Sequence, residues 1–160
     1  MSAIASFTKM PTSSLEGLRK AAIPKKRLFG KPRDVYFEYL QQHGREVVYY
    51  KWPGFLLATL LIYLDEKHKV KLMESEYGDL ATFLTQSRGV THFVFTNAQR
   101  ETYLNTLGGQ FSQEELCTYY NEFNATEGSD AGPPLRDGVI AIHQALSQLD
   151  ENSVIIFSLG

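Results

Sequence analysis

The chain has 160 residues, of which 43% are hydrophobic and 21% charged. This size and composition are typical of one globular domain, which we expect to span residues 1–160, and exclude an intrinsically disordered chain. The single cysteine, Cys117, excludes an intrachain disulfide and favours a reducing compartment. The formal net charge of −2 argues against a dedicated nucleic-acid binder, which is usually basic overall.

The first third of the chain alternates between helical and irregular patterns. Residues 1–11 are expected to form a loose lead-in. They contain no apolar stretch long enough for a signal peptide, so we expect a cytoplasmic protein. A helix is predicted over 14–22. The prolines and glycine of 23–32 indicate a linker within the domain. A second helix over 34–43, ended by Gly44, then precedes a strand rich in β-branched and aromatic residues.

The most apolar run is Trp52–Leu64, which contains no charged residue. Its 13 residues fall short of the roughly 20 that cross a bilayer as a helix, and we therefore expect no membrane partner. The run is followed by the charged segment DEKHK. Its length favours a helix over 55–68 that is buried on nearly all sides. A short strand is predicted at 70–73.

The remaining elements are separated by clear breaks. Apolar periodicity, helix caps and turn residues predict, in order, a helix over 75–89, a central strand over 91–96, a helix over 98–107, a helix over 113–123, a long loop over 124–134, a helix over 135–149 and a terminal strand over 151–160. The helix over 113–123 is expected to begin with a capping box from Ser112 to Glu115 and to have an apolar face made of Leu116, Tyr119, Tyr120 and Phe123. About seven helices and three or four strands that do not alternate strictly predict an α+β fold with helices on a small sheet. A three-layer α/β arrangement is the alternative.

Charge is divided unequally along the chain. Residues 1–73 hold 13 lysines and arginines against 6 acids, whereas residues 74–160 hold 3 against 12. The basic side is densest over 19–33, with seven positive charges in 15 residues. We define a basic patch there, made of Lys25, Lys26, Arg27, Lys31 and Arg33. Phe29 within it makes contact with nucleic acid conceivable, and a solvated linker is the simpler interpretation.

Two groups of residues in the chain are candidates for partner binding. Glu122, Glu127, Asp130 and Asp137 surround the long loop, and we interpret them as a binding surface instead of as acids that stabilise a helix N-terminus. The segment YYKWPGF has four aromatic residues in seven, and we name Tyr49 and Trp52 as candidate partner-binding residues. In a strand Tyr49 and Tyr50 face opposite sides, so one of them should face outward; the alternative is that both pack under helices. An acidic and aromatic surface of this kind suits a partner protein with a basic surface.

Catalytic and cofactor motifs are not evident in the sequence. It contains no P-loop and no G-x-S-x-G motif, and its histidines and cysteine lack metal-ligand spacing, so we predict no metal and no cofactor. Cys117 lies within a helix, away from the N-terminal position that would activate a thiol. An enzymatic site would require His92, His143 and an acid to converge from distant segments.

These observations favour a cytoplasmic, non-enzymatic protein-binding domain over an enzyme. One concrete form is an inhibitor or immunity-type protein that neutralises its partner by covering it. Two alternatives stand beside it. One is a small enzyme whose site combines distant histidines and acids, and the other is a nucleic-acid accessory factor that uses residues 19–33.

Overall fold

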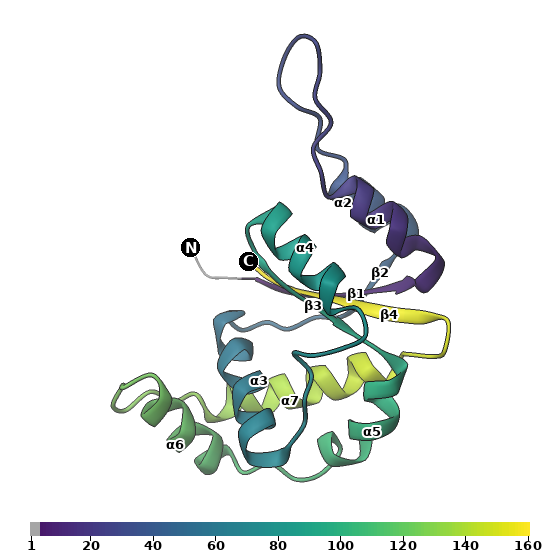
Figure 1. The fold of residues 1–160 in the computed structure, drawn as a ribbon. Coiled ribbons are helices and arrows are strands. Elements are labelled where there is room, and N and C mark those ends of the chain that lie inside the picture. Colours follow the sequence, from purple (N-terminus) through teal and green to yellow (C-terminus); the bar gives the residue numbers. More distant parts are fainter. Residues whose placement is uncertain (1–3) are drawn as a thin grey trace.

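A computed structural model describes residues 4–160 and shows an α+β fold, as expected. Its sheet has four strands in the order β2-β1-β4-β3, and every neighbouring pair is antiparallel. The strands are β1 (Ala5–Pro11), β2 (Arg45–Val48), β3 (Thr91–Phe95) and β4 (Ser153–Leu159). Both ends of the described chain lie at the same end of the sheet, where Ile4 and Gly160 exchange backbone hydrogen bonds (Figure 1).

Helices cover both faces of the sheet (Figure 1). One layer contains α1 (Leu15–Ala21), preceded by a 3-10 turn over Thr12–Ser14, with α2 (Tyr36–His43) and α4 (Gly78–Arg88). The other layer contains α3 (Phe55–His68), α5 (Asn97–Leu107), α6 (Gln113–Phe123) and α7 (Gly132–Ser147). We call them the α1 layer and the α7 layer. The sheet therefore lies between two helical layers, although its strands are antiparallel and not joined by βαβ units.

The strand β1 corrects the expectation of a loose lead-in over residues 1–11. Residues 5–11 form an inner strand that pairs with both β2 and β4, and residues 1–3 lie outside the described part. The segment ASFTKM has only two large apolar residues, Phe7 and Met10, and both are completely buried, on opposite faces of the sheet. The strand expected to be central, β3, is instead an edge strand, because β4 lies between it and β1.

The predicted strand at 70–73 is not formed. Val70 and Leu72 are buried, but the segment runs as an irregular connection between α3 and α4. The Gln99 amide nitrogen lies 3.2 Å from the Lys71 oxygen and 3.4 Å from the Leu72 oxygen, and 2.7 Å from the oxygen of Glu74 just beyond the segment. A buried glutamine thus donates to backbone carbonyl groups that a partner strand does not reach.

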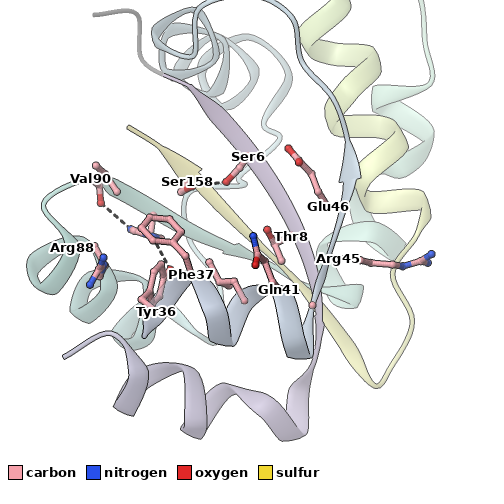
Figure 2. Close-up of a pocket in the computed structure, with 13 residues that line it drawn as sticks. Ser6, Thr8, Tyr36, Phe37, Gln41, Arg45, Glu46, Arg88, Val90 and Ser158 are labelled. Atoms are coloured by element: carbon pink, nitrogen blue, oxygen red, sulfur yellow. Dashed lines mark hydrogen bonds between the residues drawn. The ribbon is translucent and has the colours of Figure 1, made fainter. Parts of the chain in front are cut away.

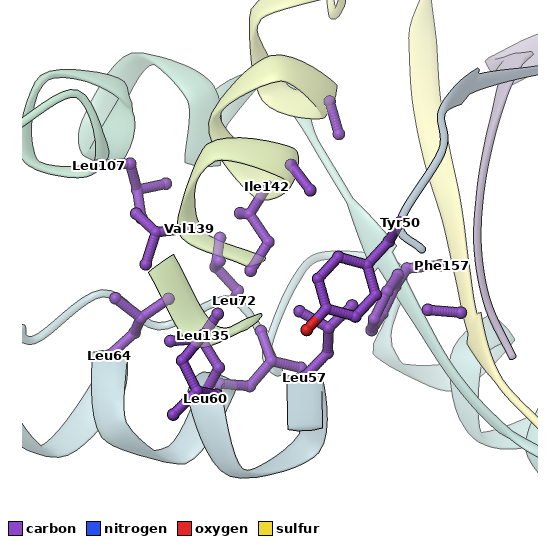
Figure 3. Close-up of a cluster of buried hydrophobic side chains, with 14 of the residues drawn as sticks. Tyr50, Leu57, Leu60, Leu64, Leu72, Leu107, Leu135, Val139, Ile142 and Phe157 are labelled. Atoms are coloured by element: carbon purple, nitrogen blue, oxygen red, sulfur yellow. The ribbon is translucent and has the colours of Figure 1, made fainter. Parts of the chain in front are cut away.

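The long apolar helix α3 packs against α7 at the centre of the larger core (Figure 3). Leu57, Leu60 and Leu64 from α3 meet Val139 and Ile142 from α7 in that view, and all five are buried. The two helices approach closely because α7 carries a glycine: a Cβ at Gly138 would lie 2.7 Å from Leu57 Cδ2. The prediction of a buried helix is confirmed. No helix within residues 4–160 is long and apolar enough to span a bilayer.

Candidate functional site

The predicted partner-binding residues separate into two places. Tyr49, Trp52 and Asp137 come together beside the start of α3, and we call this the aromatic surface. The Trp52 indole Nε1 donates a hydrogen bond of 2.8 Å to Asp137, and the Lys51 ammonium lies 3.9 Å from the same carboxylate. Asp137 is therefore already partly neutralised within the protein. The Tyr49 side chain is 84% exposed and borders a hollow of about 190 Å³.

The segment between β2 and α3 orients these aromatic residues. Tyr50, next to Tyr49, turns inward and donates a hydrogen bond of 3.0 Å to the carbonyl oxygen of Pro134. Burial raises the pKa of the Tyr50 hydroxyl above its ordinary value. The contact anchors the segment on the N-terminal turn of α7, which brings Asp137 beside Trp52. Of the two tyrosines, one is buried and the other exposed, as expected from an extended backbone.

A second group of acids lies on α6 and on the loop that follows it. Glu114, Glu122, Glu127 and Asp130 are all exposed. Within residues 4–160 none of these four carboxylates forms a salt bridge. We call these four residues, together with Tyr119 and Phe123, the acidic surface. It contains three of the predicted residues, and Asp137 belongs to the aromatic surface instead.

Aromatic rings lie among the acids of α6. The rings of Tyr119 and Phe123 are stacked with centroids 5.8 Å apart, and Phe123 is 49% exposed. The Tyr119 hydroxyl donates a hydrogen bond of 2.7 Å to Glu66 on α3, which together with burial raises its pKa. The Tyr119 ring borders a hollow of about 410 Å³ that Glu114 and Glu122 also line. The expectation that Phe123 faces the core is wrong, since Leu116 and Tyr120 fill that face of α6.

The basic patch lies on an arm that projects from the molecule between α1 and α2 (Figure 1). We call residues 23–34 the basic arm; every one of them is exposed. Lys25 and Arg33 exchange two backbone hydrogen bonds, of 2.9 Å and 3.0 Å, which close its base. The linker expected over 23–32 thus forms a hairpin-like extension.

A hollow that the sequence analysis missed lies on the α1-layer side of the sheet (Figure 2). It measures about 480 Å³, and polar side chains from β1, β3 and β4 form its floor. Ser6 and Thr8 come from β1, His92 from β3 and Ser158 from β4. The signal for it was the alternation of these residues with Phe7, Phe93 and Phe157, which is visible in the sequence only once β1 is recognised as a strand.

The polar groups in this hollow are bonded to one another. His92 Nδ1 lies 2.8 Å from the Val90 carbonyl, which can only accept, so Nδ1 carries the proton. The Tyr36 hydroxyl then donates to His92 Nε2 across 3.1 Å. Burial lowers the pKa of His92 and raises that of Tyr36 to about 12, so both groups are neutral near pH 7. Ser6 and Ser158 are bonded to each other at 2.6 Å.

Arg88, at the rim of the hollow, is held by Asp34. Its guanidinium nitrogens lie 3.2 Å and 2.6 Å from the two Asp34 oxygens, and it stacks 4.5 Å from the centroid of the Tyr36 ring. The arginine lowers the pKa of the Asp34 carboxyl through these hydrogen bonds. Because Asp34 and the Ala22 carbonyl oxygen hold its guanidinium, Arg88 supports the wall of the hollow with its charge already paired.

The convergence required for an assembled acid–base site does not occur. His92 lies on the α1-layer face of the sheet, whereas His143 lies on α7 beside Gly108, in a different hollow. Cys117 sits in the middle of α6, and its sulfur donates to the Ser129 carbonyl at 2.9 Å. Within residues 4–160 there is no group of three or more histidine, cysteine or acidic side chains placed to hold a metal ion.

Comparison with known proteins yields no relative of this chain. No protein-family model matches it, and neither the curated proteins nor the solved structures contain a match.

Proposed function

We propose that this chain is a non-enzymatic binding protein that attaches to a partner protein with a basic surface. The observation that carries the proposal is the acidic surface of α6, where carboxylates free of salt bridges accompany the exposed ring of Phe123, which stacks on the half-buried ring of Tyr119. Both features suit binding, because an exposed ring can bury apolar area in a contact and carboxylates without a partner attract a basic surface.

The two kinds of residue support different steps of association. Glu114, Glu122 and Glu127 would attract a basic partner before contact and accelerate encounter, an effect that salt weakens. The rings of Tyr119 and Phe123 would then bury apolar area at the centre of the contact, as aromatic anchors do in protein interfaces. The aromatic surface, with exposed Tyr49, would extend the contact along α7.

An inhibitor or immunity-type protein is the concrete form of this proposal that we favour. A compact binding protein that covers a basic toxin needs an acidic surface with aromatic anchors and no catalytic group of its own. The lone Cys117, which cannot form an intrachain disulfide, supports a cytoplasmic setting.

The test is site-directed crosslinking followed by affinity measurement. A benzophenone photocrosslinker in place of Phe123 is expected to capture a basic protein from an extract of the native organism. The same group in place of Phe37, an exposed phenylalanine on the other layer, serves as the matched control. The captured protein is identified by mass spectrometry and purified for calorimetry.

Charge reversal then separates the acidic surface from net charge. Replacing Glu114, Glu122 and Glu127 by lysine is expected to weaken binding of the purified partner by about tenfold or more. The control replaces Glu46, Glu74 and Glu76, which are exposed elsewhere, and changes the net charge equally. The proposal fails if both triple variants lose affinity equally, or if the two crosslinking positions capture the same proteins.

A further inference from the structure

The basic arm has the form of a two-stranded projection with an apolar tip. Its base is closed by the backbone bridge between Lys25 and Arg33, and Gly30 takes a φ of +94° near the tip, a conformation that favours glycine. Leu28 and Phe29 stand at the tip and are 93% and 85% exposed. Two adjacent apolar side chains at the end of a projection bury nothing within the chain itself.

The cations of the arm are largely uncompensated. Lys25, Lys26, Arg27 and Lys31 form no salt bridge with any described residue. Arg33 alone reaches a carboxylate, that of Glu38, at 3.4 Å, and both side chains are more than half exposed. An exposed pair of this kind holds its partners weakly. Five positive charges within nine residues therefore face the solvent.

The position of the arm separates it from the acidic part of the molecule. It extends from the α1 layer, whereas α6 lies in the other layer on the far side of the sheet (Figure 1). At physiological salt, charges are screened over about 8 Å. The local positive potential of the arm, and not the net charge of −2, therefore decides which ligands the arm attracts. An interpretation from net charge alone would overlook this.

We propose that the basic arm binds single-stranded nucleic acid. The lysines and arginines would contact phosphate groups, and the exposed ring of Phe29 would stack on an unpaired base with Leu28 packing beside it. The cations occur at successive positions along both sides of the arm, from its base to its tip. This arrangement follows a phosphate chain, whereas a flat lipid surface would meet only those next to the tip.

Unpaired bases suit this tip better than a duplex does. In a duplex the faces of the bases are covered by their neighbours, so Phe29 could stack only after bases were separated. In a single strand the faces are accessible, and aromatic stacking tolerates any sequence. The arm is thus expected to prefer single strands and to discriminate little between base sequences.

The experiment measures fluorescence anisotropy of a labelled 20-nucleotide single-stranded DNA, the RNA of the same sequence and the matched DNA duplex. With up to five phosphate contacts, the affinity for a single strand is expected to fall about 100-fold between 50 and 200 mM salt. The triple variant Lys25→Gln, Lys26→Gln, Arg27→Gln is expected to bind more weakly, and to lose only about sevenfold over the same range.

Matched variants separate the arm from general charge and from folding. Lys67→Gln, Lys69→Gln, Lys71→Gln removes the same charge from exposed positions outside the arm and should leave binding nearly unchanged. Phe29→Ala is expected to weaken single-strand binding about fivefold or more, whereas Phe37→Ala, an exposed phenylalanine on α2, should not. Circular dichroism of every variant verifies that the fold is intact.

Several results would overturn the proposal. One is the absence of binding to every oligonucleotide at 50 mM salt, and another is an equal loss of binding in both triple variants. Equal affinity for the duplex and the single strand, with no effect of Phe29→Ala, would exclude base stacking. Phosphatidylserine-containing vesicles are tested in parallel; binding to them without binding to oligonucleotides would identify a lipid surface instead. None of these measurements depends on the acidic surface.

Discussion

The two faces of the sheet differ in how far along the strands their apolar character extends. On the α7-layer face, Phe7, Phe95 and Phe157 continue the core through the middle of the sheet, and all three are completely buried. On the α1-layer face, Met10 and Ile156 are buried in a smaller core, but the strands then change to Ser6, Thr8, His92 and Ser158.

This difference assigns separate tasks to the two layers. The α7 layer supplies most of the buried apolar area, which is the main source of folding free energy. The α1 layer covers only part of its face and leaves a hollow of about 480 Å³ with a polar floor, which we call the polar hollow. It also carries the basic arm, whereas the acidic surface belongs to the α7 layer. The chain therefore presents opposite charges on the two sides of one sheet.

The largest expected effect tests this asymmetry with two neighbouring residues. Phe157→Ala removes a ring that lies 4.7 Å from the centroid of Phe7 and 5.2 Å from that of Phe95. We expect a loss of about 3–5 kcal/mol in the free energy of unfolding, since a large cavity remains in the core. Ser158→Ala, on the opposite face of the same strand, should cost less than about 1 kcal/mol.

Urea denaturation at pH 7.5, followed by circular dichroism, measures both variants. The Ser158→Ala variant loses only the hydrogen bond between Ser158 and Ser6, and this bond lies beside a hollow that water can enter. Similar losses in the two variants would contradict the unequal roles of the two faces.

Much of the helical framework could be predicted from the sequence, because it depends on local patterns. Residues 55–68 formed a helix as predicted, and the Ser112 hydroxyl accepts from the Glu115 backbone N–H, as its spacing indicated. The strand β1 could not be predicted in the same way, because small and polar residues in ASFTKM conceal its pairing with β2 and β4. Pairing between residues more than 140 positions apart leaves no local signal.

The sequence identified several residues of the candidate surfaces, but it did not show which of them lie together. Asp137 was expected to act with Glu122, but the hydrogen bond from Trp52 places it in the aromatic surface, 85 residues away in sequence from its partner. Phe123 was expected to face inward, since one helical turn separates it from Tyr119 and both positions fit an apolar stripe. The register of α6 against its neighbours, fixed by Leu116 and Tyr120, decides this, and it is a property of tertiary packing.

An intermediate effect is expected from the buried hydrogen bond beside the polar hollow. Tyr36→Phe removes the hydroxyl that donates to His92 Nε2 and leaves that buried nitrogen without its donor. We expect a loss of about 1–2 kcal/mol in the free energy of unfolding. Tyr49→Phe, whose hydroxyl is on an exposed side chain, should change it by less than about 0.5 kcal/mol. Urea denaturation of the two variants decides this, and equal stabilities would show that the Tyr36–His92 contact contributes nothing.

The smallest effect is a dependence of stability on pH that originates at His92. Burial lowers the pKa of His92 below its ordinary value near 6.5, and the charge of Arg88 lowers it further. The unfolded chain therefore binds a proton at this residue at a higher pH than the folded chain does. Its contribution to stability is complete above the unfolded pKa and is lost as pH falls from there through the folded pKa.

The variant His92→Gln isolates this contribution from those of the other titrating groups. It is expected to be less stable than the parent chain at pH 7.5, because it loses the hydrogen bonds of the His92 ring with Tyr36 and the Val90 carbonyl. Its stability should nevertheless fall less between pH 7.5 and 5.5. His143→Gln, on the opposite layer, provides the control for removing a histidine. If the parent chain and His92→Gln lose equal stability over that interval, the folded protein accepts a proton at His92 as readily as the unfolded chain. The polar hollow would then be far more hydrated than its hydrogen bonds indicate, and the contrast between the two faces of the sheet would be greater still.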